Sequence, residues 1–304
     1  MDNKIAMIMP YFGKWPKWIN LFFYSCGKNE FIDFYIFSDC PKPHNLSKNI
    51  IFTSISWEEY CKQISDALDV NFKDVEPYKL CDIRPAYGYI YQNILDNYQF
   101  WGYGDIDLSY GNLKSWLTNK LLDKYNIIST HANRLSGHFC LIRNTAPNRN
   151  AFRKFKNWKK RITDKKVYGF DEYDFTEYFV PNIYWVHRID RYIGAFFGIS
   201  HYKIFSMIMP FFLFRKKIHM KELWTSPAPK ESEKWIYNLS TGEMTSPNRK
   251  KLPYLHFLFF KKTPFYQTDI YWKDDFWKVS DSTINQGKGF IIFTNKEVFY
   301  KEKY

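Results

Sequence analysis

The sequence predicts an α/β fold, with a mostly parallel sheet and helices on both of its faces. Two observations predict this class. Short apolar runs alternate with helical patterns from residue 4 to about residue 130, and 45% of the 304 residues are apolar, which is enough for a buried core. Aromatic residues make up 21% of the chain. Because aromatic rings are costly to leave in water, many of them must line the core, grooves or interfaces.

The first elements follow from local patterns. Residues 4–9 (KIAMIM) form a short apolar run that stops at a Pro-Tyr-Phe-Gly turn, which indicates a buried strand. A helix is expected over 15–25, because Pro16 suits a first helical turn and apolar spacing follows it. Residues 32–37 (IDFYIF) indicate a second strand, which ends in Ser-Asp.

Strands and helices continue to alternate. Residues 50–55 indicate a third strand, and 58–68 a helix. A further helix is expected to begin at Arg84-Pro85 and to run to about Asn97, before a strand at 99–103 (QFWGY).

Beyond residue 130 the pattern changes. Strands are expected at 127–130 and 138–142, and 147–161 is expected to be an amphipathic helix, with aromatic residues at helical spacing among lysines and arginines. For these aromatic residues, core packing and a role at an interface both fit the spacing.

Charge and cysteine usage limit the classes of protein. The formal net charge is +13, and residues 131–170 carry eleven Lys or Arg against one acid. This basic zone favours a polyanionic partner such as nucleic acid, anionic lipid or a phosphate-bearing substrate, although a solvated surface explains it equally well. The five cysteines include no CxxC pair, so neither a disulfide framework nor a structural zinc site is indicated.

No segment reads as a membrane span or as a targeting signal. The longest apolar run, residues 204–214, has eleven residues with a proline inside, and about 20 are needed to cross a bilayer. The N-terminal residues are better explained as a strand. We therefore expect a cytoplasmic location.

Polar residues follow three of the expected strands. They are Pro10 to Phe12, Asp39, and the Asp105-Ile-Asp107 motif. In parallel sheets, ligands bind beyond the carboxyl ends of the strands, so these positions predict one site. Two carboxylates two residues apart can chelate a divalent cation. The alternative for Asp105 is a turn or a helix cap.

The order of four motifs carries a resemblance. PYFG, FSD, YKLCDIRPAYG and WGYGDIDLSYGNL occur in that order along the chain. This set resembles bacterial polysaccharide glycosyltransferases of the GT-A type, which build capsules or O-antigens, and among them a group whose function is often given as unknown. The similarity covers residues 4 to about 260. It implies a GT-A-like, Rossmann-type nucleotide-binding sheet with C-terminal elements near the acceptor or the membrane.

The resemblance implies a divalent cation, Mn²⁺ or Mg²⁺, beneath the diphosphate of a nucleotide sugar. Asp107 would be a direct metal ligand, and Asp105 would contact the ribose or the metal. The residues implied in donor binding are Pro10, Tyr11, Phe12, Asp39, Lys79, Asp82, Arg84 and Asp105. The expected activity is transfer of a hexose, with galactose or glucose and UDP favoured, in polysaccharide biosynthesis.

A C-terminal segment, PYLHFLFFKK, fits the same chemistry. It is similar to the returning segment of GT-A enzymes, so His256 would complete the metal site and Lys261 and Lys262 would meet the phosphates. Imidazole is an acceptable ligand for Mn²⁺, and lysine is a good point charge for a leaving diphosphate. The alternative for His256 is a strand histidine bonded to a backbone carbonyl.

A carboxylate near the acceptor hydroxyl is needed if the anomeric configuration is inverted. Asp171 and Glu172 are the candidates for this catalytic base, with Asp171 narrowly favoured; a helix N-terminal cap is the alternative for both. The segment RLSGHF resembles the loop that borders the acceptor, so Gly137 and His138 are expected on the acceptor side.

The resemblance also suggests partners and an organisation. The acceptor is expected to be a lipid-diphosphate-linked glycan, with the protein peripheral on the inner face of the cytoplasmic membrane. Residues 1–130 would form the donor-binding part, 131–262 the acceptor-binding and site-closing part, and 263–304 an extension. The alternatives are a basic nucleic-acid-binding protein, for which no motif is present, and a nucleotidyltransferase, for which a Gly-rich phosphate loop is missing. We therefore expect no nucleic-acid partner.

Overall fold

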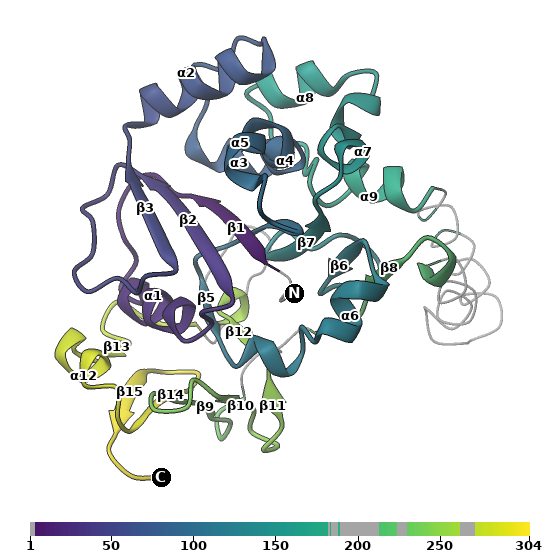
Figure 1. Cartoon of the computed structure of the whole chain (residues 1–304). Helices are drawn as coiled ribbons and strands as arrows, with labels where there is room; N and C mark the ends of the chain where they lie inside the picture. The colour runs from purple at the N-terminus through teal and green to yellow at the C-terminus, as the bar shows by residue number, and fades with distance from the viewer. Residues whose placement is uncertain (1–3, 182, 184–187, 189–212, 224–229, 262–270) are drawn as a thin grey trace. The chain divides into compact units, whose positions relative to one another are not determined.

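The structure is a computed structural model that describes residues 4–181, 183, 188, 213–223, 230–261 and 271–304 (Figure 1). The chain divides into two compact units. The first unit consists of Met1–Pro10, Ile55–Gly104 and Asn119–Glu222, and the second of Tyr11–Ser54, Asp105–Thr118 and Leu223–Tyr304. Both units are therefore discontinuous in the sequence.

Among the described residues, the first unit contains five sheet strands in the order β1-β4-β7-β6-β8. Their bounds are Ile5–Pro10 for β1, Phe100–Gly104 for β4, Ile127–Ser129 for β6, Phe139–Arg143 for β7 and Ile218–Met220 for β8. The pairs β1/β4 and β6/β8 are parallel, whereas β7 runs antiparallel to both β4 and β6. The first five residues of β1 are buried, as expected for a strand covered on both faces.

In the part of the first unit that the structure describes, the helices are short, apart from α2. In Figure 1, α3, α4, α5 and α7 lie close together. The described helices are α2 (Trp57–Leu68), α3 (Leu80–Ile83), α4 (Tyr87–Ile90), α5 (Gln92–Leu95), α6 (Asn119–Lys124), α7 (Ala146–Arg149), α8 (Trp158–Thr163) and α9 (Asp174–Phe179), with 3₁₀ turns η1 (Pro77–Lys79), η2 (Arg84–Ala86) and η4 (Ala151–Lys154). A capping box between Ser56 and Glu59 fixes the start of α2.

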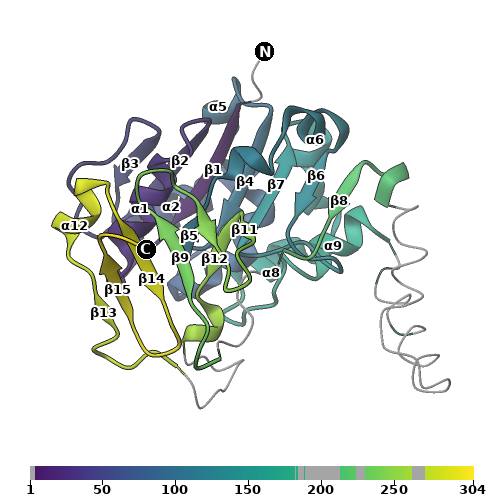
Figure 2. The same ribbon diagram turned by 90° about the horizontal axis from the view of Figure 1, so that it is seen from below.

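The second unit combines a parallel strand pair with an antiparallel sheet. Strands β2 (Ile32–Ser38) and β3 (Ile50–Ser54) are parallel, and helix α1 spans Ile19–Gly27. The six-stranded sheet has the order β11-β10-β9-β14-β15-β13, and Figure 2 shows β9, β14 and β15 side by side. Its strands are β9 (Trp235–Asn238), β10 (Met244–Thr245), β11 (Lys251–Leu252), β13 (Trp277–Lys278), β14 (Phe290–Phe293) and β15 (Val298–Lys301). The remaining elements are β5 (Leu108–Tyr110), β12 (Tyr254–His256), η3 (Leu113–Ser115), η5 (Leu258–Phe260) and α12 (Asp281–Gln286).

The α/β class predicted from the sequence is confirmed, with parallel strand pairs and helices between strands. The sheet is less parallel than expected, since β7 is antiparallel to both of its neighbours. The chain that follows β4 reverses its direction before it enters the sheet again as β7, so β7 pairs antiparallel with β4.

Three expected helices are shorter or broken. The helix expected over 15–25 begins at Ile19, and the one expected over 84–97 is interrupted at Tyr91, whose φ and ψ are −104° and 19°. The Tyr91 hydroxyl donates to Tyr60 Oη at 2.7 Å in the core, and this packing overrides the helical pattern.

The segment 147–161 is also not one helix, because Phe155 is extended, with a φ of −81° and a ψ of 124°. Its ring packs on Phe170, while the ring of Phe152 packs on Trp158. Phe152 and Trp158 are six residues apart, so in one straight helix their rings would lie on different faces and about 9 Å apart along the axis, and they could not pack together. Phe152 is fully buried, so for this residue core packing is the correct alternative.

Candidate functional site

The Asp105-Ile106-Asp107 turn leads into β5 and is held by backbone and side-chain bonds of the second unit. Strand β5 pairs antiparallel with β12, so that His256 lies opposite Leu108. The amide N–H of Phe257 donates to the carbonyl of Asp107 at 2.9 Å. The indole N–H of Trp18 donates to the carbonyl of Ile106 at 3.0 Å. These contacts fix the backbone between the two carboxylates.

Asp105, Asp107 and His256 form the candidate metal centre. One ligand atom from each of the three lies within 4.8 Å of the others. His256 is buried in β12, while the two aspartates are partly exposed. Two carboxylate oxygens and one imidazole nitrogen suit a divalent cation of the Mn²⁺ or Mg²⁺ type, and they leave positions for a ligand's own oxygens. The residues therefore fit the group that the sequence predicts, in the part of the chain that the structure describes.

Lys261 forms an ion pair with Asp107, and His256 Nε2 lies 3.5 Å from the other carboxylate oxygen of Asp107. Burial by itself raises the pKa of Asp107. The nearby Lys261 ammonium and the His256 imidazole outweigh this effect and hold the pKa well below its ordinary value. Asp107 is therefore a carboxylate at neutral pH, which is the form that binds a cation.

The loop that follows β1 is ordered by Asp39. The carboxylate of Asp39 accepts the amide N–H of Gly13 at 2.9 Å, and the amide of Tyr11 donates to the Phe37 carbonyl at 2.9 Å. Gly13 has a φ of 118°, a conformation that favours glycine. The rings of Tyr11 and Trp15 are stacked, with centroids 5.2 Å apart.

The pKa of the Tyr11 phenol is raised. Burial is the largest cause, followed by the electrostatic effect of Cys40, Asp107 and Asp39. Tyr11, Asp39 and Asp107 all belong to the second unit. Phe12 is 6% exposed, and Pro10 is the last residue of β1 in the first unit.

In the first unit, Lys79 and Asp82 form a buried ion pair, with Nζ and Oδ2 2.8 Å apart and the side chains 1% and 0% exposed. Asp82 also accepts the amide N–H groups of Tyr168 at 2.9 Å and Phe170 at 2.7 Å. These contacts tie η1 and α3 to the segment that precedes Asp171. The donor-binding role of Lys79 and Asp82 stays a prediction, and their observed contacts are within the protein.

Asp171 and Glu172 are each paired with an arginine. Arg84 Nη1 donates to Asp171 Oδ2 at 2.8 Å, and Arg134 Nε donates to Glu172 Oε2 at 3.0 Å. The amide N–H of Gly137 donates to Glu172 Oε1 at 3.1 Å. A Cβ on Gly137 would lie within 3.2 Å of side-chain atoms of all three charged neighbours, Arg84, Asp171 and Glu172, so a larger residue there would displace one or more of these side chains. The structure thus brings Arg84, Gly137, Asp171 and Glu172 together.

Both candidate bases lie before α9, which begins at Asp174, rather than inside its first turn. Their side chains differ in access, since Asp171 is 3% exposed and Glu172 24%. His138 is buried nearby; its Nδ1 lies 2.9 Å from Ser136 Oγ and its Nε2 lies 3.3 Å from Thr130 Oγ1. These contacts are within the protein, and the acceptor-side role of His138 stays a prediction.

Sequence reasoning missed three residues of these clusters: Trp15, Trp18 and Arg134. Trp15 stands next to Pro16, and Arg134 stands before the Ser-Gly turn, so both lie in segments that the sequence singles out. No spacing rule connects Trp18 to a carbonyl 88 residues away. Only the folded chain shows that contact. Lys262 and the apolar run 204–214 lie outside the described residues, apart from the last two of the run.

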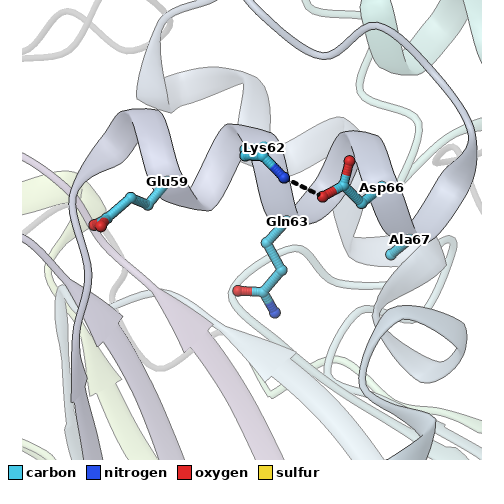
Figure 3. A pocket seen from close by; sticks show the side chains of 5 residues that line it. All are labelled: Glu59, Lys62, Gln63, Asp66 and Ala67. Atoms are coloured by element: carbon cyan, nitrogen blue, oxygen red, sulfur yellow. Dashed lines mark hydrogen bonds and ion pairs between the residues drawn. The ribbon is translucent and has the colours of Figure 1, made fainter.

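A cavity lies along α2 of the first unit and is lined by Glu59, Lys62, Gln63, Asp66 and Ala67 (Figure 3). The ammonium of Lys62 pairs with Asp66 at 2.7 Å, as the dashed line in Figure 3 shows. The Glu59 carboxylate accepts the backbone N–H of Ser56 at 3.0 Å. These charges serve the helix itself, and the cavity contains none of the candidate site residues. Among the described residues, no helix has the length and apolar character that crossing a membrane requires.

Some solved structures are similar to the chain at low identity. One is galactosyltransferase LgtC in complex with donor and acceptor sugar analogs, at 10% identity over 55% of this chain and 70% of that chain, with a TM-score of 0.31. Another is the glycosyltransferase GlyE of Streptococcus pneumoniae TIGR4, at 14% identity over 71% of this chain and 54% of that chain, also with a TM-score of 0.31. Values this low do not define the activity of the chain.

No protein with a curated description matches the sequence. One family model does match, and it covers residues 7–287, which is most of the 304 residues. This protein belongs to that family, the family of unknown function DUF6625.

Proposed function

We propose that this protein is a metal-dependent glycosyltransferase that moves a hexose from a nucleotide sugar to a glycan acceptor. The observation that carries the proposal is the grouping of Asp105, Asp107 and His256 within 4.8 Å, with Lys261 on Asp107. Carboxylates and an imidazole suit a divalent cation, and an adjacent ammonium suits a phosphate. The four ordered motifs of the sequence support the same assignment.

The metal centre and Lys261 serve the leaving group. A bound Mn²⁺ or Mg²⁺ supplies positive charge that stabilises the diphosphate as it departs. Asp105, Asp107 and His256 would hold that ion. The Lys261 ammonium, 27% exposed, lies beside Asp107 and would hydrogen-bond to a diphosphate oxygen. Lys262 would add a second positive charge.

The stacked Tyr11 and Trp15 rings and the Asp39 carboxylate would hold the nucleoside. An aromatic pair offers a face for a planar base, and a carboxylate accepts hydrogen bonds from ribose hydroxyls. Asp39 is exposed and already accepts one N–H, from Gly13, so lone pairs of its carboxylate are still available to a ribose. We propose UDP as the nucleotide, with galactose or glucose as the sugar.

The chemical step would be a single displacement with inversion at C1 of the sugar. An acceptor oxygen attacks C1, the bond from C1 to the diphosphate oxygen breaks, and its electron pair leaves with the diphosphate. The acceptor proton passes to a carboxylate. Of the two candidates we now favour Glu172 over Asp171, because Glu172 is 24% exposed and Asp171 only 3%. Lys79 and Asp82 would act by holding the segment that carries both.

The acceptor is proposed to be a lipid-diphosphate-linked glycan at an anionic membrane surface. Seven exposed cations support this: Arg153, Lys154, Lys156, Lys159, Lys160, Lys165 and Lys166. Phosphates and anionic headgroups attract such a surface. Phe152 cannot take part in insertion because it is fully buried, whereas Phe155 and Trp158 of the same segment are partly exposed.

Thermal stability with nucleotide sugars tests the assignment most directly. A ligand that binds only the folded chain raises its melting temperature. We expect a UDP-hexose to raise it in the presence of Mn²⁺ and much less in EDTA. Stabilisation by nucleotide triphosphates alone would favour a nucleotidyltransferase, and stabilisation by DNA or RNA alone would favour a nucleic-acid-binding protein; either result overturns the proposal.

A further inference from the structure

Trp18 touches the Asp105-Asp107 turn from the residues that precede α1. Its indole Nε1–H donates to the carbonyl of Ile106 at 3.0 Å. Ile106 is the residue between the two carboxylates. A carbonyl held here fixes the plane of the peptide between Ile106 and Asp107, and it therefore constrains the direction in which Asp107 projects.

The same ring lies against the ammonium of Lys261, with Nζ 5.5 Å from the ring centroid. This is within the range of a cation–π attraction. Lys261 also forms the ion pair with Asp107. One side chain thus contacts both the turn that carries the carboxylates and the cation beside them.

Trp18 is itself held by aromatic residues of the second unit. Its ring lies 5.6 Å from Phe257, 6.4 Å from Trp272 and 6.3 Å from Phe276, measured between centroids. Trp272 and Phe276 are stacked at 4.5 Å and belong to the core of the six-stranded sheet. Rings packed in this way have little freedom to turn, so the direction of the indole N–H is fixed.

We infer that Trp18 is a positioning residue of the metal centre: it holds the backbone between Asp105 and Asp107 and fixes the ammonium of Lys261 beside them. The inference rests on the metal centre of the proposed function. It also gives the core of the six-stranded sheet a role, since aromatic residues that pack in that core hold Trp18 in place. Residues that orient metal ligands without touching the ion have large effects on affinity.

A phenylalanine separates this role from simple packing. Trp18→Phe keeps an aromatic ring for the cluster and for Lys261, and it removes only the indole N–H and part of the ring. Trp57→Phe is the matched control, because the Nε1–H of Trp57 also donates to a backbone carbonyl, that of Val75 at 3.2 Å, among aromatic neighbours. Trp57 belongs to the first unit and is not part of the aromatic group that holds Trp18.

The measurement is Mn²⁺ affinity of the full chain, by electron paramagnetic resonance or calorimetry, with the melting temperature of each variant recorded. We expect Trp18→Phe to weaken Mn²⁺ binding by about 10-fold or more, as loss of an outer-shell partner does. Trp57→Phe should bind Mn²⁺ like the wild type even if its melting temperature falls. Equal Mn²⁺ affinities for the two variants would overturn the role of Trp18.

Two further outcomes are decisive. If the wild-type chain binds no Mn²⁺, the metal centre of the proposed function fails, and the inference fails with it. If Trp18→Phe does not fold, the wild-type protein is titrated with Mg²⁺ and its indole N–H signals are followed by NMR. The Trp18 signal should shift and the Trp57 signal should not; an unmoved Trp18 signal contradicts the inference.

Discussion

Lys261 forms an ion pair with Asp107 across 154 residues of sequence. The contact brings the segment after β12 to the turn before β5, which β5 and β12 also join by pairing. Together with His256, the ammonium holds the pKa of Asp107 well below its ordinary value, against the effect of burial. The ion pair and the pairing of β5 with β12 thus hold the Asp107 carboxylate in the same position.

The depressed pKa of Asp107 predicts a pH dependence of stability. A carboxyl with a lower pKa in the folded state stabilises the fold above its unfolded value, about 3.9, and this contribution is lost as pH falls through the folded value. Lys261→Met removes the main cause of the depression. We therefore expect wild type to lose more unfolding free energy between pH 7 and acid than Lys261→Met does. Urea titrations at a series of pH values measure this, and parallel curves would contradict it.

Asp107→Asn should abolish metal-dependent binding of the donor while the fold persists. The substitution removes a charged ligand and is nearly the same size, and the loss of metal charge is worth several kcal/mol in the transition state. Calorimetry with a UDP-hexose and Mn²⁺ provides the readout. The control is Asp66→Asn, which removes an exposed carboxylate on α2. Donor binding by Asp107→Asn at the wild-type level would show that Asp107 is not a ligand.

The sequence was sufficient to predict β1 to β4, β6 and β7, because each depends on local signals, but it did not predict the six-stranded sheet. The grouping of Asp105, Asp107 and His256 agrees with the expected metal ligands, whose role stays a prediction. Apolar runs mark β1, β2 and β4, and Asp105 and Asp107 directly follow β4. The metal-binding role of His256 was predicted from the similarity of the segment PYLHFLFFKK to the returning segment of GT-A enzymes. The contact of Trp18 with Ile106 could not be predicted, since it depends on how separate segments pack.

The predictions of helix length were wrong for the same reason. The pattern over 84–97 is helical, yet the buried bond from Tyr91 to Tyr60 breaks it. The burial of Lys79 and Asp82 could also not be predicted from the sequence, because an ion pair between residues three apart is usually at the surface. Tertiary contacts determine where these helices end and which ion pairs are buried, and such contacts cannot be derived from a single sequence.

Asp82→Asn should be strongly destabilising. It would leave the Lys79 ammonium buried without its partner and would weaken the bonds to the Tyr168 and Phe170 amides. Breaking a buried pair in this way costs about 3–5 kcal/mol. Urea unfolding at neutral pH measures the free energy.

Asp66→Asn is the matched control for this experiment, because Lys62 and Asp66 also pair along a helix but are 76% and 67% exposed. An exposed pair of this kind is worth about 0.5 kcal/mol or less. Similar costs for the two substitutions would mean that the buried pair does not hold the segment before Asp171.

Association with anionic vesicles should depend on charge. Replacing Lys154, Lys156, Lys159 and Lys160 by glutamine removes four exposed cations, each worth about 1 kcal/mol near an anionic surface. Co-sedimentation with phosphatidylserine vesicles should fall in this variant and, for wild type, with rising salt. Equal binding of wild type to neutral vesicles, or no binding at low salt, argues against the membrane surface as partner.

The catalytic base is tested by amide substitutions at neighbouring positions. Glu172→Gln keeps the size and the ability to accept the Gly137 N–H, but it removes the basic carboxylate; turnover should fall by about 10² to 10⁴ with little change in donor affinity. Asp171→Asn should act mainly on stability, because Asp171 is buried against Arg84. Glutamate at 172 is thereby distinguished from a helix cap, whose loss would lower the melting temperature without a selective loss of turnover. NMR of the product gives the independent check, since a base on that face requires the anomeric configuration of the donor to be inverted. Retention of that configuration, or near-normal turnover in Glu172→Gln, would mean that Glu172 only orders the Gly137 loop through Arg134.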